Sequence, residues 1–313
     1  WVSEIMLQQT RVQAVLPYFQ RFMEAVPDVQ TLAELPEEQL LRLWQGLGYY
    51  SRARNLKKAA QTVVNDCGGV FPDTYEALRS LAGIGDYTAG AILSIAFGQA
   101  VPAVDGNVLR VAARLTGCGD NVLDPKVRAA FRQAMAAVMP QDRPGDFNQA
   151  LMDLGAGVCL PNGRPLCDRC PAAAFCAARE RGTQGELPVR EKKKEKRQVR
   201  RTVFIMKQTD GRVALRQRPD KGLLAGLWEY PHVEGRLDET AAAAQLAQWG
   251  VTVRQWEKTI QARHEFTHLR WDMTGYLLTV TGGGQPDWLW ADGAQRRQRA
   301  IPSAFQKFTD ELE

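Results

Sequence analysis

The fold of the first half of the chain is indicated by the stretch Leu81-Ala82-Gly83-Ile84-Gly85-Asp86-Tyr87-Thr88-Ala89. It lies between residues 74–80 and 88–97, which both show the apolar spacing of helices. Two glycines two residues apart permit a tight turn, whose exposed amides, with the N-terminus of the next helix, can hold one phosphate. The stretch therefore predicts a helix-hairpin-helix unit that binds a phosphate backbone, although a plain turn between helices would look the same in these two glycines.

The apolar pattern around this hairpin predicts helices over most of the first half and strands only after about residue 200. Apolar residues recur every three to four positions over 12–23, 40–47, 56–64 and 127–138, and Asp124-Pro125 has the composition of a helix start. Beyond the charged run 190–197, strands are expected at 202–207, 212–217, 254–262 and 269–280, with one helix at 239–248. The charged run is typical of a linker between an all-α and an α+β part.

Composition and charge exclude several classes of protein. With 313 residues, 45% hydrophobic and 24% charged, the chain is not disordered, collagenous or a coiled coil throughout. No apolar stretch approaches the roughly eighteen residues of a membrane span. The net charge of +5 equals the excess of basic residues in 186–201 alone, so the overall charge is no argument for a nucleic-acid partner.

Four of the six cysteines fall close together, at Cys159, Cys167, Cys170 and Cys176. Four thiols at short separations suit a closed zinc site or a [4Fe–4S] cluster in a reducing compartment. Zinc sites usually combine two Cys-x-x-Cys pairs, and only one pair is present, so the spacing favours the cluster. Cys67 and Cys118 stand apart and are expected to be ordinary core residues.

Taken together, these motifs resemble the MutY-type adenine DNA glycosylases. The resemblance is carried by Trp1-Val-Ser-Glu-Ile-Met-Leu-Gln-Gln-Thr10, Gly46-Leu-Gly-Tyr-Tyr-Ser-Arg-Ala-Arg-Asn-Leu56, the glycine hairpin, Val104-Asp-Gly-Asn-Val108 and the cysteine loop, in that order. The C-terminal part resembles the MutT-like (Nudix-fold) domain of the same family. The first cysteine spacing is one residue longer than the family's, which an insertion within 160–166 would absorb.

The resemblance implies a multidomain protein. An all-α helix-hairpin-helix glycosylase domain is expected over 1–183, with the hairpin unit at about 75–97 and an iron-sulfur loop at 159–176 that holds a [4Fe–4S] cluster. A basic linker would occupy 184–201 and an α+β Nudix-like domain 202–313. Members of the family usually have further residues before the position of Trp1.

The resemblance also implies the reaction, which is removal of adenine paired with 8-oxoguanine or guanine in double-stranded DNA after the adenosine leaves the helix. It places the acid that protonates adenine at Glu4 and the carboxylate that stabilises the oxocarbenium-like sugar at Asp105, with Asn107 and Tyr87 positioning that carboxylate and the sugar. Outside these motifs, a Glu in a first helical turn is usually a surface residue, and an Asp before Gly is usually a cap.

DNA contacts are implied at Gln8, Gln9, Thr10, Tyr49, Gly83 and Gly85. Gln9 and Tyr49 resemble side chains inserted at the lesion, although a Tyr49 buried in the core is the competing interpretation. The cluster is expected to organise a loop that presents Arg164 and Arg169 to DNA.

Tyr87 separates this chain from strand-cleaving relatives, which carry a lysine there for a Schiff base, so we expect a monofunctional glycosylase. In the second domain, residues 238–248 lack the clustered acids of an active Nudix hydrolase. Phe266-Thr267-His268 resembles the family's Phe-Ser-His loop, which recognises 8-oxoguanine through the N7 donor that guanine lacks.

Three alternatives remain open at this point: a pyrimidine-lesion glycosylase with lyase activity, a non-catalytic DNA-binding protein, and a free-nucleotide hydrolase. The expected partner is double-stranded DNA with adenine opposite 8-oxoguanine or guanine. The expected protein is a cytoplasmic, bacterial monomer without a membrane partner.

Overall fold

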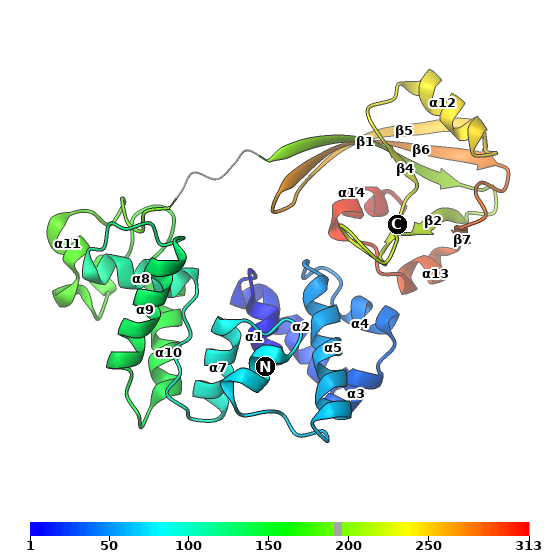
Figure 1. Ribbon diagram of the computed structural model, residues 1–313. Coiled ribbons are helices and arrows are strands. Elements are labelled where there is room, and N and C mark those ends of the chain that lie inside the picture. Colours follow the sequence, from blue (N-terminus) through cyan, green and yellow to red (C-terminus); the bar gives the residue numbers. More distant parts are fainter. Residues whose placement is uncertain (191–195, 313) are drawn as a thin grey trace. The chain divides into compact units, whose positions relative to one another are not determined.

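A computed structural model describes residues 1–190 and 196–312, and Figure 1 traces the chain. It divides into two compact units: Trp1–Phe19, Met23–Glu34 and Arg54–Lys193 form one, and Gln20–Phe22, Leu35–Ala53 and Lys194–Glu313 form the other. Residues 191–195 of the basic run lie outside the described residues. No helix in the described part is long and apolar enough to cross a membrane.

The chain up to residue 190 is helical, as the apolar spacing predicts, and its described residues contain no strand. Its helices are α1 (Val2–Leu7), α2 (Val12–Ala25), α3 (Val29–Glu34), α4 (Glu37–Leu43), α5 (Ser51–Asp66), α6 (Tyr75–Ser80), α7 (Asp86–Ala96), α8 (Gly106–Thr116), α9 (Pro125–Val138), α10 (Pro144–Asp153) and α11 (Ala177–Arg181). Short helical turns follow α10 at Leu154–Val158, Cys167–Arg169 and Ala173–Phe175.

Two helices differ from the predicted limits for local reasons. The helix predicted at 40–47 is α4, which starts at Glu37 because Pro36 precedes it and two acidic residues favour its first turn. It ends at Leu43, before Gly46 and Gly48, whose φ angles of 101° and 71° do not continue a helix. The predicted helix 88–97 is α7, which begins two residues earlier, at Asp86.

The hairpin between α6 and α7 is fixed by caps and by packing. Thr74 caps α6 by accepting from the amide of Ala77, and Gly85 is the N-cap of α7. The two helices share an apolar cluster with α5 that includes Val63, Leu78, Ile84 and Leu93. This cluster holds the turn at residues 81–85 on the surface of the first unit.

A seven-stranded sheet forms the C-terminal part, with the order β3-β2-β1-β6-β5 and with β4 and β7 paired to β1 and β2. Its strands are β1 (Arg197–Lys207), β2 (Val213–Gln217), β3 (Trp228–Glu229), β4 (His232–Glu234), β5 (Thr252–Glu265), β6 (Leu269–Thr281) and β7 (Trp288–Ala291). β1 runs parallel to β6, and β5 and β6 form a long antiparallel hairpin. The α+β prediction is confirmed.

Both faces of this sheet carry apolar residues that pack against helices. One cluster joins the sheet to the segment after residue 300, including α14 (Gln306–Thr309), through Trp271, Phe305 and Phe308. The other joins it to α12 (Glu239–Gln248) through Phe204, Leu246 and Leu278.

The strand prediction missed several limits. β1 begins five residues before the predicted Thr202, because the ladder with β6 continues back to Arg197 and buries Val199. β3, β4, β7, α13 (Gly293–Gln298) and α14 were not predicted, since elements of two to six residues are too short to show a period.

Candidate active site

One pocket of the first unit gathers the acidic residues that the sequence analysis singled out. Its cavity volume is about 530 Å³, and its lining includes Glu4, Tyr87 and Asp105 together with the hairpin glycines Gly83 and Gly85. These residues come from α1, the hairpin, the start of α7 and the start of α8. The helical fold thus brings positions 4 and 105 to the same cavity.

Within the pocket, Tyr87 is bound to Glu4. Its hydroxyl donates to Oε2 of Glu4 at 3.2 Å and lies 3.5 Å from Sδ of Met152. Burial, followed by the negative charges of Glu4 and Asp105, raises the pKa of Tyr87 above its usual range. Tyr87 is therefore a neutral phenol that orients the Glu4 carboxyl group.

Asp105 caps α8 and is held at both oxygens. Oδ1 accepts from the amides of Asn107 and Val108, each at 2.8 Å, and Oδ2 accepts from Nδ2 of Asn107 at 3.0 Å. Such a cap fixes the side chain at the N-terminus of the helix. Asn107 thus contacts Asp105 through both its backbone amide and its side chain, and its role in positioning Asp105 stays a prediction.

Asn107 is held in turn by the side chain of Arg110, which is buried, with 3% of its surface exposed. It donates to Oδ1 of Asn107 at 3.0 Å, to the carbonyl of Gly155 at 2.7 Å and to that of Cys159 at 2.8 Å. A chain of hydrogen bonds therefore joins Asp105 to the backbone at Cys159.

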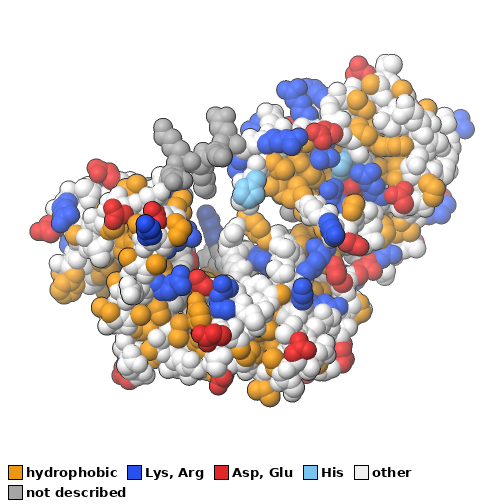
Figure 2. Space-filling view, viewed as in Figure 1, with side chains coloured by type: hydrophobic (Ala, Val, Ile, Leu, Met, Phe, Trp, Pro, Cys, Tyr) orange, Lys and Arg blue, Asp and Glu red, His pale blue; other side chains and the backbone are white. Residues whose placement is uncertain are grey.

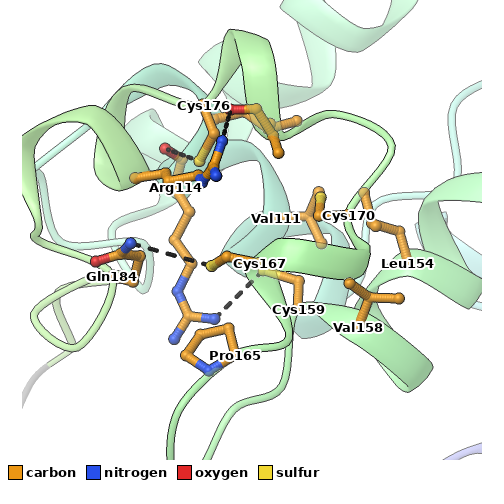
Figure 3. A pocket seen from close by; sticks show the side chains of 13 residues that line it. Val111, Arg114, Leu154, Val158, Cys159, Pro165, Cys167, Cys170, Cys176 and Gln184 are labelled. Atoms are coloured by element: carbon orange, nitrogen blue, oxygen red, sulfur yellow. Dashed lines mark hydrogen bonds between the residues drawn. The ribbon is translucent and has the colours of Figure 1, made fainter.

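The four predicted cysteine ligands line one cavity, which Figure 3 shows together with Arg114. Nη1 of Arg114 lies 3.3 Å from Sγ of Cys159, and Sγ of Cys176 lies 3.4 Å from the carbonyl of Arg114. Among the described residues, no three His, Cys, Asp or Glu side chains are arranged to hold one metal ion. The four thiols thus line one cavity of the first unit.

The residues predicted to contact DNA backbone around the hairpin have distinct conformations. Gly83 has φ 79°, and a Cβ there would lie 2.8 Å from Cβ of Asn55, so glycine is required. Gly85 is extended, with open space where a side chain would be. Nε2 of Gln8 donates to Oγ1 of Thr88 at 3.1 Å, which ties the end of α1 to α7, and Oγ1 of Thr10 donates to the carbonyl of Gln8 at 3.5 Å.

The two predicted wedges, Gln9 and Tyr49, have left-handed backbones, with φ 59° and 49°. Such conformations cost free energy in residues other than glycine and concentrate at functional sites. The Tyr49 side chain is 46% exposed, so its alternative placement in the core is wrong. The exposed side chains of Arg164 and Arg169 lie in the cysteine loop.

The predicted turn with Phe266, Thr267 and His268 lies at the tip of the β5–β6 hairpin, since β5 ends at Glu265 and β6 begins at Leu269. The rings of Phe266 and Trp271 pack edge to face with centroids 4.9 Å apart. Thr267 and His268 are exposed. Phe266 therefore anchors the loop, and Thr267 and His268 expose a hydroxyl and an imidazole.

A buried charged network supports that anchor. Trp271 is covered by the guanidinium of Arg201, 4.4 Å from the ring centroid, and Nη1 of Arg201 lies 3.1 Å from Nδ1 of His232. The other nitrogen, Nε2, lies 2.9 Å from Oε2 of Glu229, which is 1% exposed and also bound by Arg216 and Arg218. Although burial raises it, these hydrogen bonds and charges lower the pKa of Glu229 to about 2.

Several of these residues were missed by sequence reasoning. Arg52, which is 8% exposed, lies with its guanidinium 5.5 Å from the Tyr49 ring centroid and donates to the carbonyls of Leu47 and Gly48. Arg52 lies within one of the family motifs and Arg110 lies just after another, so their place in the sequence could have indicated a role. Glu229 and His232 carried none, because their partners are distant in sequence.

Comparison with known proteins gives matches over both parts of the chain. Residues 2–137 match the HhH-GPD superfamily of base excision DNA repair proteins, and residues 202–311 match the NUDIX domain. The chain is 35% identical over 361 residues to the adenine DNA glycosylase of Rattus norvegicus, covering 98% of this chain and 70% of that protein. It is 36% identical over 333 residues to the Homo sapiens adenine DNA glycosylase, covering 90% of this chain and 61% of that protein.

Among solved structures, a thermostable thymine-DNA glycosylase is similar with a TM-score of 0.52 and 29% identity, covering 57% of this chain and 82% of that one. An endonuclease III bound to DNA shares the fold with a TM-score of 0.51 and 24% identity, covering 58% of this chain and 84% of that one.

Proposed function

The chain belongs to the family of adenine DNA glycosylases, and we propose that it removes adenine paired with 8-oxoguanine or guanine from duplex DNA. The observation that carries the proposal is the pocket shared by Glu4, Tyr87 and Asp105 beside the glycine hairpin. Two carboxyl groups at one cavity suit cleavage of a glycosidic bond, and the adjoining turn suits a phosphate. In this proposal residues 1–183 are the catalytic domain, 184–201 the tether and 202–313 the recognition domain.

Glu4 acts as the acid. Adenine is a poor leaving group until it is protonated, and a carboxyl group inside the pocket can donate that proton as the N-glycosidic bond breaks. The Tyr87 hydroxyl, 3.2 Å from Oε2 of Glu4, fixes the direction of the carboxyl group. A phenol that stays neutral holds Glu4 without adding a second negative charge.

Asp105 stabilises the sugar as it becomes positively charged. A carboxylate held in place by two amides and by Asn107 needs little rearrangement when that charge develops, which is the basis of electrostatic preorganisation. Water then takes the place of adenine at the sugar carbon and leaves an abasic site.

The DNA is held by the hairpin and opened by the two strained residues. The amides around Gly83 and Gly85 bind one phosphate, with Gln8 and Thr10 supporting the turn beside it. Gln9 and Tyr49 insert into the helix and exchange lost base stacking for an extruded adenosine. Both have left-handed backbones and exposed side chains.

The 266–268 loop recognises the base opposite adenine. The hydroxyl of Thr267 and backbone acceptors beside it can accept a hydrogen bond from the N7 donor of 8-oxoguanine, which guanine does not offer. Segment 238–248 has only Asp238 and Glu239 as acids, and Asp238 caps α12 by accepting from the amide of Ala241 at 2.8 Å. This domain therefore recognises DNA and does not hydrolyse nucleotides.

The cysteine cavity fits a [4Fe–4S] cluster better than one zinc ion. Four thiolates about 2.3 Å from zinc would converge to within about 4 Å of one another, whereas a cubane keeps its ligands farther apart. Four thiols that line one cavity without forming a site for one ion agree with the cluster. Cys159, Cys167, Cys170 and Cys176 would hold it, and it would organise the loop with Arg164 and Arg169. Purified protein should contain about four iron and four sulfide per chain, and stoichiometric zinc would exclude the cluster.

The enzyme is monofunctional, because Tyr87 cannot form a Schiff base with the abasic sugar. The test is single-turnover base release from duplexes with adenine opposite 8-oxoguanine, guanine or thymine, and with thymine glycol opposite adenine, each with and without alkali. We expect release of adenine opposite 8-oxoguanine and guanine, visible as strand breaks only after alkali.

Three results would contradict the proposal. Strand cleavage without alkali at the rate of base release would indicate a lyase, and tight binding without release would indicate a DNA-binding protein. Magnesium-dependent hydrolysis of an 8-oxo nucleoside triphosphate would indicate that the second domain is a hydrolase.

A further inference from the structure

The C-terminal sheet has an open groove of about 890 Å³ that the proposed function does not use. Its lining includes residues of three neighbouring strands, where Arg200 of β1 and Arg263 of β5 lie opposite Asp272 of β6 in the strand register. The segment from Ser303 to Asp310 closes one side. Figure 2 shows Lys and Arg side chains on the visible face of this sheet.

The charge in the groove is unbalanced. Arg200, Arg236, Arg263 and Lys307 line it, against Asp272 and Asp310. Asp272 is occupied, since Oδ1 accepts from Nε of Arg263 at 2.9 Å and Oδ2 from Nη2 of Arg270 at 3.3 Å. Oδ1 of Asp310 accepts from Nε2 of Gln306 at 2.8 Å. The acids are thus engaged with other partners.

Arg200 and Arg236 remain as the two cations available to a ligand. Both side chains are exposed, and neither makes a hydrogen bond or ion pair with any residue that the structure describes. Their backbones are adjacent, because the amide of Gly235 donates to the carbonyl of Arg200 at 2.9 Å. Two exposed cations that start from adjacent backbones can both reach one anion, and an anion bound between them offsets their repulsion.

The lining determines what kind of anion fits. Among the residues that the structure describes, no aromatic side chain lines the groove, so they offer no platform for a base. Guanidinium groups instead match the oxygens of phosphates, which they can bind at two points. The chemistry is that of a phosphate backbone.

The position of the groove selects duplex DNA. Arg263 lies near the end of β5, four residues before Thr267 in the turn that follows. Four residues of extended chain span about 13 Å. That length spans about four base pairs of B-form DNA. A duplex recognised at the 266–268 loop can therefore extend along the groove.

We propose that this groove binds the phosphate backbone of the DNA duplex a few base pairs from the base that the 266–268 loop recognises, with Arg200 and Arg236 as the phosphate ligands. The inference rests on the proposed function in taking damaged duplex DNA as the substrate. It adds a second, sequence-independent contact that anchors the recognition domain.

The test is the salt dependence of DNA binding by the full chain. The duplex carries 2′-fluoro-2′-deoxyadenosine opposite 8-oxoguanine, since the fluorine disfavours the oxocarbenium-like state and the base is retained. Each phosphate contact contributes about 0.9 to the slope of log K against log salt. The double variant Arg200→Ala/Arg236→Ala should lower the slope by about 1.8 and weaken binding about tenfold near physiological salt.

Two further variants separate charge from structure. Arg254→Ala/Arg297→Ala removes two exposed arginines of the same part of the chain outside the groove and should keep the slope and the adenine release of the unmodified protein. Arg200→Lys/Arg236→Lys should retain most of the slope, because lysine also binds phosphate as a point charge. Thermal melting of each variant verifies that it is folded.

Equal slopes for the groove and control alanine variants would overturn the inference. So would an 8-oxo nucleoside triphosphate that binds in an Arg200-dependent manner while the duplex slope stays constant, since the groove would then serve free nucleotides. Absence of adenine release by the unmodified protein is a separate result, and it contradicts the proposed function.

Discussion

Nη1 of Arg110 donates a hydrogen bond of 3.0 Å to Oδ1 of Asn107. Because the amide oxygen is occupied in this way, the amide nitrogen of Asn107 is turned toward Oδ2 of Asp105, 3.0 Å away. The remaining donors of Arg110 bind the carbonyls of Gly155 and Cys159. The orientation of the Asp105 carboxylate, which we propose to be catalytic, thus depends on the segment that carries the first cysteine.

Replacement of Arg110 by alanine should therefore slow adenine release more than it weakens DNA binding. Outer contacts that orient a reacting group are typically worth about 10- to 100-fold in rate. We expect a loss of that size at saturating enzyme, with a dissociation constant within about threefold of the original, measured by single-turnover kinetics and fluorescence anisotropy.

The matched control is Arg143→Ala on the same unit, where an exposed arginine pairs with Asp146. It should leave the rate unchanged. Arg110→Ala also leaves the buried carbonyl of Gly155 without this donor, at about 1 to 3 kcal/mol, so thermal melting must verify folding at the assay temperature. An unchanged rate in a folded Arg110→Ala protein would show that Asn107 holds Asp105 without this support.

Replacement of Glu4 or Asp105 by the corresponding amide should abolish most of the adenine release and leave DNA binding intact. Glu4→Gln removes the proton donor and should slow release by about 10²- to 10⁴-fold. Asp105→Asn keeps the shape of the side chain and removes the charge that we propose stabilises the sugar, so it should slow release by about 10²- to 10³-fold. Glu76→Gln, an exposed acid in the first turn of α6, is the control. Full activity in either active-site variant would remove that residue from the mechanism.

The two hairpin glycines should respond differently to alanine. Gly83→Ala meets both a positive φ of 79° and the Cβ of Asn55 at 2.8 Å, so it should destabilise the first unit by at least about 1 kcal/mol. Gly85→Ala enters open space from an extended backbone and should leave the melting temperature nearly unchanged. Its methyl group instead blocks the approach of a phosphate, so DNA binding should weaken. Unchanged binding by a folded Gly85→Ala protein would exclude this turn as a phosphate site.

The sequence indicates most of the fold because its signals are local. The period of apolar residues predicts α2, α5 and α12, and the Asp124-Pro125 start of α9 is confirmed by the hydrogen bond from the amide of Lys126 to Oδ1 of Asp124. The long β5–β6 hairpin follows from its alternating residues. Elements as short as β3 or β7 depend on pairing with distant strands, so no local pattern predicts them.

The candidate site likewise has residues that a local motif indicates and residues that depend on distant contacts. Glu4, Asp105 and the cysteines belong to motifs, so the resemblance to a family was enough to place them at a site. The sequence does not indicate the contacts of the charged residues that support the site. Arg110 binds the carbonyl of Cys159, which is 49 positions away, and Glu229 lies in a strand of two residues. Only the folded chain shows that Arg110 and Glu229 are buried beside loops to which we assign a function.

Glu229→Gln should destabilise the C-terminal part of the chain, because it leaves the cations of Arg216 and Arg218 without their buried counterion. Losing one member of such a network costs about 3 to 5 kcal/mol at neutral pH. Urea unfolding followed by tryptophan fluorescence measures this free energy. Glu265→Gln, which removes an exposed carboxylate that pairs with Lys196, is the control and should stay near the original stability.

The pH dependence of the same variant tests the cause. The pKa of Glu229 is about 2 in the folded chain against an ordinary 4.5, so the folded state binds fewer protons and its ionised carboxylate stabilises the fold fully above about pH 4.5. That stabilisation, of the order of 3 kcal/mol, is lost as the pH falls from 4.5 toward 2, and Glu229→Gln should lack this part of the decline. Because Trp271 and Phe266 pack against each other beside this network, the variant should also lower the preference for 8-oxoguanine over guanine opposite adenine. If the acid profiles of variant and unmodified protein stay parallel, Glu229 is not the titrating group, and an unchanged preference would show that the 266–268 loop is held independently of the network.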